Sequence, residues 1–77
     1  RLLPIGKFGL IAIDRVVAVG SVKSAPMRRL MRATPPEWVV VLTGGQRRQT
    51  ALVLDSGHVV ITPMTITELV HWLTLEE

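Results

Sequence analysis

The chain of 77 residues contains no cysteine. Disulfides and thiolate metal sites are therefore excluded as sources of stability. A single domain of this length, residues 1–77, buries only about 60% of the surface that its unfolded chain exposes, so its own core is marginal. Association with copies of itself is the remaining way to stabilise such a scaffold. Because 48% of the residues are apolar and the mean hydropathy is +0.40, we expect a homo-oligomer.

Long apolar runs are also missing. The longest unbroken run is the segment Trp38–Leu42, whereas a membrane-spanning helix needs about 20 apolar residues. The N-terminal segment has neither a continuous apolar stretch nor a small-residue cleavage site, so it does not resemble a signal peptide. We therefore expect a cytoplasmic protein with no membrane partner. Because the first residue is Arg1 and not methionine, we expect that native residues precede it.

Cations are absent from the last part of the chain. All nine lysines and arginines lie at or before residue 48, where Asp14 and Glu37 are the acidic residues, a balance of +7. From residue 49 onward, four acidic residues give −4, so the sequence predicts one basic and one acidic surface. Seven of the nine cations are arginine, whose planar guanidinium suits phosphates and base edges. A nucleic acid is therefore a candidate partner, and a basic surface that is merely solvated is the alternative.

Strand-forming residues account for most of the chain. Segments that are rich in β-branched residues and bounded by turn residues predict five strands. These are Leu10–Ile13, Val16–Gly20, Trp38–Thr43, Thr50–Leu54 and His58–Thr62. The last two are joined by Asp55-Ser56-Gly57, which is typical of a tight hairpin turn in which glycine takes a positive φ.

A short helix is predicted between the second and third of these strands. Ser24 is a suitable N-cap, and Pro26 falls in the first turn, where its missing N–H costs nothing. Pro35-Pro36 ends the helix, because residues before proline disfavour helical geometry. Apolar residues spaced i, i+3, i+4 predict one buried stripe, formed by Met27, Leu30 and Met31. The cations that face elsewhere are Arg28, Arg29 and Arg32.

A second helix begins at a capping box, in which Thr65 is followed three residues later by Glu68. Its apolar stripe comprises Ile66, Leu69, Val70 and Leu73. Trp72 and Leu75 lie off that stripe, and we interpret them as a subunit contact in preference to a wide core face, because the core is small. The resulting order, ββαβββα, is an α+β domain with one mainly antiparallel sheet and two short helices.

Titratable side chains are too few and too scattered to predict an enzyme. Asp55, Ser56 and His58 are neighbours on one turn, which cannot place a base against a nucleophile with a separate orienting acid behind it. His58 and His71 lie on different elements with no cysteine nearby, so we expect no metal site. The glycine connection lacks the spacing and the Lys-Ser/Thr ending of a phosphate-binding P-loop. We expect no cofactor and no small-molecule substrate.

Basic side chains gather at three places. They are Arg15, the helical Arg28, Arg29 and Arg32, and the pair Arg47-Arg48 on the connection from Gly44 to Gln49. Arginines on the outer face of a helix are usually only solvated, whereas two arginines on a glycine loop gain nothing for the fold and favour phosphate binding. An ion pair with the preceding Asp14 is the alternative role for Arg15. The three aromatic residues, Phe8 among them, are too dispersed to stack single-stranded bases.

Five blocks of the sequence, in order, resemble the RemA family of bacterial regulators. The blocks are Gly6-x-Phe8-Gly9, Arg15 before a valine-rich strand, Ser24 to Met31, Thr43-x-Gly45-x-Arg47, and Asp55-Ser56-x-His58-Val59. The resemblance covers essentially the whole chain. It implies a transcriptional activator of extracellular-matrix and biofilm genes, with a fold similar to the LytTR DNA-binding domain. It also implies a closed homo-oligomeric ring that contacts and wraps double-stranded DNA.

The resemblance also implies which residues contact DNA. By position, the DNA-contacting arginine of the family matches Arg15, and its paired arginines fall on Gln46 and Arg47, with Arg48 offering a second cation one place later. Moving one residue along an extended segment reverses the side that it faces, so Arg48 compensates for Gln46 only if the loop is irregular. Further candidates for DNA contact are Arg28 and Arg29. Sequence preference would then come mainly from DNA shape, since no recognition helix is evident.

Two alternatives to a DNA-binding regulator stay open at this point. The first is a structural oligomer that binds a protein partner through Trp72 and Leu75 without binding DNA, and Gln46 is the residue most in its favour. The second is an enzyme or small-ligand module, which retained ligand after purification would reveal.

Overall fold

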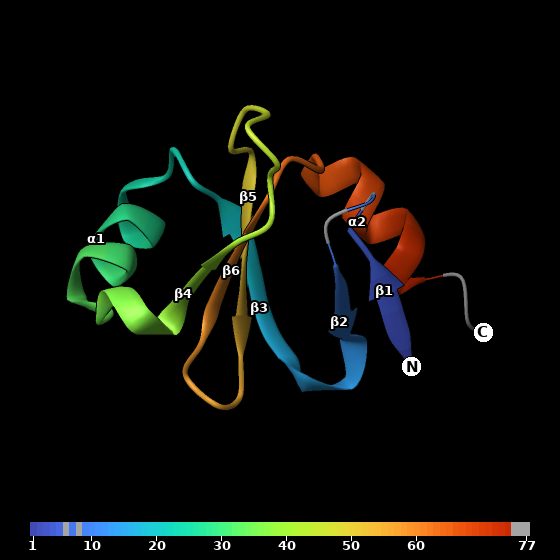
Figure 1. The fold of residues 1–77 in the computed structure, drawn as a ribbon, viewed down its shortest axis with the longest axis horizontal. Coiled ribbons are helices and arrows are strands. Elements are labelled where there is room, and N and C mark those ends of the chain that lie inside the picture. Colours follow the sequence, from blue (N-terminus) through green and yellow to red (C-terminus); the bar gives the residue numbers. More distant parts are fainter. Residues whose placement is uncertain (6, 8, 75–77) are drawn as a thin grey trace.

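The computed structural model describes residues 1–5, 7 and 9–74, and this part of the chain forms two sheets and two α-helices. The larger sheet has the strand order β3-β5-β6-β4. Its strands are β3 (Val16–Ser21), β4 (Val39–Val41), β5 (Thr50–Leu54) and β6 (Val59–Thr62). β5 runs antiparallel to β3 and to β6, whereas β4 runs parallel to β6. The predicted α+β class with a mainly antiparallel sheet is confirmed (Figure 1).

A separate two-stranded sheet corrects the predicted element order. β1 (Leu2–Pro4) pairs antiparallel with β2 (Leu10–Ala12). The sequence does not predict β1, because it is short and ends in a proline, a residue that lacks the N–H of a strand ladder. The predicted strand Leu10–Ile13 ends one residue early, since Ile13–Arg15 form a 3₁₀ helix, η1, that leads into β3. The order is therefore βββαβββα with two sheets, and not ββαβββα with one.

The strand predicted at Trp38–Thr43 is also shorter in the structure. The segment Pro36–Trp38 forms a 3₁₀ helix, η2, in which the Trp38 N–H donates to the Pro35 carbonyl (2.9 Å). The local geometry favoured by two consecutive prolines thus overrides the strand preference of the tryptophan. β6 likewise begins one residue later than predicted, and β5 has the predicted bounds.

The turn between β5 and β6 forms as predicted. The Gly57 N–H donates to the Leu54 carbonyl (3.0 Å), and the Leu54 N–H donates to the His58 carbonyl (2.9 Å). Gly57 has φ +96°, a conformation that side-chain-bearing residues rarely adopt. This three-residue loop ending in a left-handed glycine is a common hairpin connection.

Both helices begin where the sequence predicts. In α1 (Ala25–Ala33), the Ser24 hydroxyl accepts a hydrogen bond from the Met27 N–H (3.3 Å), and the helix stops at Thr34, before the prolines. In α2 (Ile66–Leu73), the Glu68 N–H donates to the Thr65 hydroxyl (3.2 Å), while the Thr65 N–H donates to the Glu68 carboxylate (2.8 Å). Neither helix in the described part of the chain has the length and hydropathy of a membrane span.

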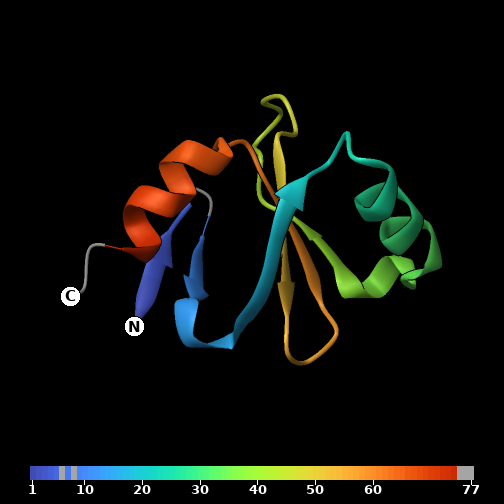
Figure 2. The same ribbon diagram turned by 180° about the vertical axis from the view of Figure 1, so that it is seen from behind.

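The larger sheet is the middle of three layers. α1 covers one face, and the β1–β2 sheet together with α2 covers the other (Figures 1 and 2). The side chains that meet beneath α1 are Met27, Ala51, Val59 and Ile61. Those that meet beneath the small sheet and α2 are Leu3, Ile5, Ile11, Leu52, Val60 and Leu69. Alternate residues of β5 and β6 enter opposite cores, as strand geometry requires.

The apolar stripe predicted on α2 is buried in part. Leu69 is fully buried and Leu73 is half-buried, whereas Ile66 and Val70 are exposed. Because α2 lies at the end of the molecule, only one side of the helix packs against the core between the two sheets. Trp72, predicted to lie off the core stripe, is 37% exposed. Leu75 lies outside the described residues, so its predicted role in a subunit contact stays a prediction.

Candidate nucleic-acid interface

The glycine loop between β4 and β5 presents the predicted arginine pair to solvent. Gly44 and Gly45 both have positive φ, +56° and +87°. The buried Thr43 accepts a hydrogen bond from the Gln46 N–H (2.9 Å), and beyond the loop the Gln49 N–H donates to the Thr62 carbonyl (2.9 Å). The loop is thus tied to the sheet at both ends and irregular between them.

The irregular backbone of this loop affects whether Arg48 can replace the arginine that is missing at Gln46. The segment from Gln46 to Arg48 has no strand geometry, so the rule that consecutive residues face opposite sides does not apply. Gln46, Arg47 and Arg48 are all exposed. Within the part of the chain that the structure describes, neither arginine pairs with a carboxylate. Both guanidinium groups are available to an anionic partner.

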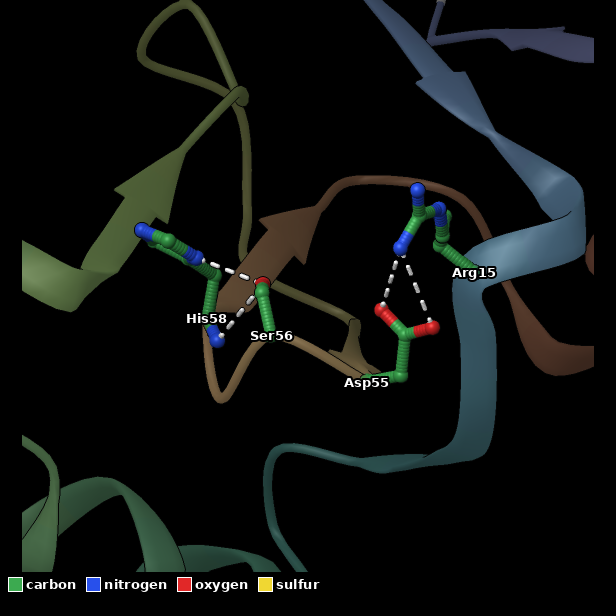
Figure 3. Close-up of polar contacts among 4 residues, drawn as sticks. All are labelled: Arg15, Asp55, Ser56 and His58. Carbon is green, nitrogen blue, oxygen red and sulfur yellow. Dashed lines mark hydrogen bonds and ion pairs between the residues drawn. The ribbon is translucent and has the colours of Figure 1, made fainter.

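Arg15 lies at the end of η1, beside the β5–β6 hairpin. Its carbonyl accepts the Asp55 N–H (2.8 Å), and one terminal guanidinium nitrogen, Nη1, lies 3.4 and 3.5 Å from the two carboxylate oxygens of Asp55 (Figure 3). The Arg15 side chain is 67% exposed. The partner is thus Asp55, forty residues away in sequence, and not the neighbouring Asp14, which contacts the amino group of Arg1 (3.1 Å).

The two arginine sites lie at opposite ends of the larger sheet. β3 pairs with β5 so that Val16 is opposite Leu54 and Ser21 is opposite Thr50. Arg15 is therefore next to the last residue of β5, and the arginine pair precedes its first residue. A strand of this length spans roughly 17 Å. The fold does not bring Arg15 and the loop arginines together in one subunit.

The remaining candidates lie on α1. Arg28 and Arg29 are exposed, as is Arg32, and α1 carries no acidic residue in its first turn. Among the described residues, none of these arginines has an ion-pair partner. This helix covers the face of the sheet opposite α2, so its cations form a third basic site, separate from the loop (Figure 2).

The hairpin residues that superficially suggest a hydrolytic trio are divided between two contacts. The Ser56 hydroxyl lies 2.6 Å from His58 Nδ1, whereas the Asp55 carboxylate turns toward Arg15 (Figure 3). The His58 ring stacks on Trp38 with a centroid distance of 4.6 Å and an interplanar angle of 18°. The acid therefore does not orient the histidine. Sequence reasoning missed this stack, because no local pattern links two residues that are 20 positions apart.

Comparison with known proteins identifies the family of the chain. The family model "Extracellular matrix regulatory protein A-like" (RemA-like) matches residues 2–73. Proteins from Bacillus cytotoxicus, Bacillus mycoides and Bacillus cereus strain B4264, each named "Putative regulatory protein", are 31% identical over 78 aligned positions. Each alignment covers 100% of this chain and 90% of the relative. The family match spans both arginine sites and nearly every described element, and the chain therefore belongs to the RemA-like family.

Proposed function

We propose that this protein is a cytoplasmic DNA-binding transcriptional regulator, which assembles into a homo-oligomeric ring and activates genes of the extracellular-matrix and biofilm type. Its arginines hold the phosphates of double-stranded DNA. Membership of the RemA-like family and the regulatory names of the relatives support a regulatory role. A fold related to the LytTR domain is part of the same proposal.

The proposal of DNA binding depends mainly on one observation. Arg47 and Arg48 are exposed on a loop with two left-handed glycines, and neither has an ion-pair partner among the described residues. A Cβ placed on Gly45 would meet nothing within 4 Å, so the backbone here is open to a large partner. Arg47 and Arg48 do nothing for the core, and their planar guanidinium groups suit phosphate. A loop of this kind grips a phosphate backbone without reading bases.

The distance between the two arginine sites shapes the proposed complex. Consecutive phosphates of one DNA strand advance about 3.4 Å along the helix axis, and the major groove is about 12 Å wide. Sites roughly 17 Å apart therefore contact different phosphates. Each subunit supplies two sites that bind phosphate weakly. Many subunits together bind the duplex tightly through avidity.

Exposed apolar side chains support the homo-oligomer. The small sheet is apolar on both faces: Leu3 and Ile11 are buried on the inner face, while Leu2 and Leu10 are 59% and 62% exposed. α2 adds Ile66 and Val70 at the same end of the molecule. We call this surface the small-sheet face.

A second apolar surface lies around the strand at the other edge. Its members are Leu30, Trp38, Val40 and Val41, which are 38–42% exposed. Val40 and Val41 are consecutive and point to opposite sides of the sheet, so this surface wraps around its β4 edge. We call this edge surface the β4 face. The two faces lie toward opposite ends of a molecule whose longest extent is 34 Å (Figure 1). Different surfaces at opposite ends suit a head-to-tail contact, which closes into a ring when the rotation allows.

Affinity for a duplex across a salt series, measured together with oligomeric mass, tests the proposal. We expect a large oligomer whose log affinity falls with log salt by about 0.9 per phosphate neutralised. Arg47→Ala lowers the magnitude of that slope and leaves the mass unchanged, whereas Arg32→Ala, which removes the same charge from α1, has a smaller effect.

The main rival is an oligomeric protein-interaction module that does not bind DNA. The same two apolar faces favour it, because they fit a protein partner as well as a second subunit. A large oligomer with no affinity for duplex DNA at low salt would support this rival and contradict the proposed DNA binding.

A further inference from the structure

Asp55 is held beside Arg15 by the main chain as well as by charge. The Asp55 N–H donates to the Arg15 carbonyl (2.8 Å), which extends the pairing of β3 with β5 into the hairpin. Asp55 also opens the turn that closes at Gly57, so its backbone is fixed from both sides. Its short side chain therefore keeps the carboxylate within a few ångströms of Arg15.

The contact between the two side chains is loose. Both carboxylate oxygens lie 3.4–3.5 Å from the same nitrogen of Arg15, whereas strong charge-assisted hydrogen bonds measure about 2.7–2.9 Å and arginine forms them in parallel pairs. The other terminal nitrogen points away from Asp55 (Figure 3). This geometry does not orient the guanidinium firmly, and it leaves donors for a phosphate.

We propose that Asp55 is a fixed counter-charge that weakens the contact between Arg15 and a DNA phosphate. The inference rests on the proposed DNA binding and refines it. A phosphate that reaches Arg15 comes close to the carboxylate of Asp55, whose main chain is held beside Arg15, and like charges repel. Each subunit then binds weakly, and firm binding requires several subunits together. The loop arginines differ from Arg15 in this respect, because Arg47 and Arg48 have no such counter-charge among the described residues.

The experiment measures affinity for a short DNA duplex by fluorescence anisotropy across a salt series. Asp55→Asn removes the charge, keeps the side-chain size and suits a turn. Asp55→Ser, also a turn residue, is a second variant that checks the first. Glu37→Gln is the matched control, because it removes the same charge from an exposed residue of η2. The mass of each oligomer is measured in the same buffers.

We expect Asp55→Asn to bind DNA about two- to fivefold more tightly than wild type at low salt, the size of effect that an exposed charge pair produces. Glu37→Gln changes the affinity less, and the gap between wild type and Asp55→Asn narrows as salt screens the repulsion. In an Arg15→Ala background, Asp55→Asn changes the DNA affinity no more than Glu37→Gln does, because the contact between Arg15 and phosphate, which Asp55 weakens, is absent.

Three results would overturn the inference. If both Asp55 variants bind as weakly as wild type or more weakly, Asp55 either does nothing or positions Arg15. If the gain persists without Arg15, it is a general charge effect. If wild-type protein does not bind duplex DNA at all at low salt, the proposed function itself fails and the inference fails with it.

Discussion

Gln46 stands where the resemblance to the RemA family implies the first of two adjacent arginines. The loop that holds it is irregular and exposed, so a charge at this position reaches the same solvent region as Arg47 and Arg48. We expect Gln46→Arg to tighten DNA binding and to increase the magnitude of the salt slope by up to about 0.9 for each subunit on the duplex. Thr67→Arg, which adds the same charge on α2, is the control. Equal effects of the two variants in the salt series would show that only net charge matters.

Two glycines with positive φ allow backbone strain and side-chain crowding to be compared in their effect on the free energy of unfolding. Gly45 has φ +87° with open space around it, whereas a Cβ on Gly57, at φ +96°, would lie 3.2 Å from the Trp38 ring. Gly45→Ala should lower the free energy of unfolding by about 1 kcal/mol through backbone strain alone. Gly57→Ala adds the crowding of Trp38 and should cost about 2 kcal/mol. Urea unfolding at one protein concentration measures both, and equal losses would mean that Trp38 moves aside freely.

At the scale of elements, α2 depends on its first turn. The helix has eight residues, too few to be stable alone, and it is attached to the core chiefly through the buried Leu69. Thr65→Ala removes one half of the capping box and should lower the free energy of unfolding by about 1 kcal/mol. Thr67→Ala changes the same residue type inside the helix, where no hydrogen bond is lost, and should cost much less. Thermal or urea unfolding compares the two, and equal losses would argue against the cap.

Elements with local signals were predictable, and those without were not. Ser24, Thr65 and Gly57 act on neighbours within three residues, so caps and turn could be read directly from the sequence. β1 is not predictable, because a three-residue strand ending in proline has no periodicity and exists only through its partner β2. Propensity favours a strand at Trp38, but the two prolines before it place this residue in a 3₁₀ helix.

At the scale of the whole molecule, the two apolar faces predict how subunits associate. In a head-to-tail ring, a lysine on either face blocks one side of each contact and leaves the other side intact. Leu10→Lys on the small-sheet face and Val41→Lys on the β4 face should each give monomers. An equimolar mixture of the two should give a dimer and nothing larger, because one wild-type pair of faces survives.

Native mass spectrometry or light scattering distinguishes these states. Gln46→Lys, which adds the same charge at an exposed polar position of the loop between β4 and β5, outside both faces, should leave the assembly intact. Dimers formed by either lysine variant alone would mean that a face contacts its own copy, and they would contradict the head-to-tail arrangement.

Features that depend on composition and on short-range geometry follow from the amino-acid sequence alone. These are the α+β class, the caps, the hairpin turn, the absence of cysteine chemistry and the exposed arginine pair beside two glycines. Each follows from residue type or from contacts a few positions apart. Three features become visible only in the folded chain. They are the pairing of Arg15 with Asp55, the separation of Arg15 from Arg47 by the length of β5, and the apolar character of both faces of the small sheet. These depend on which strands become neighbours, and strand pairing joins residues whose distance in the sequence carries no signal.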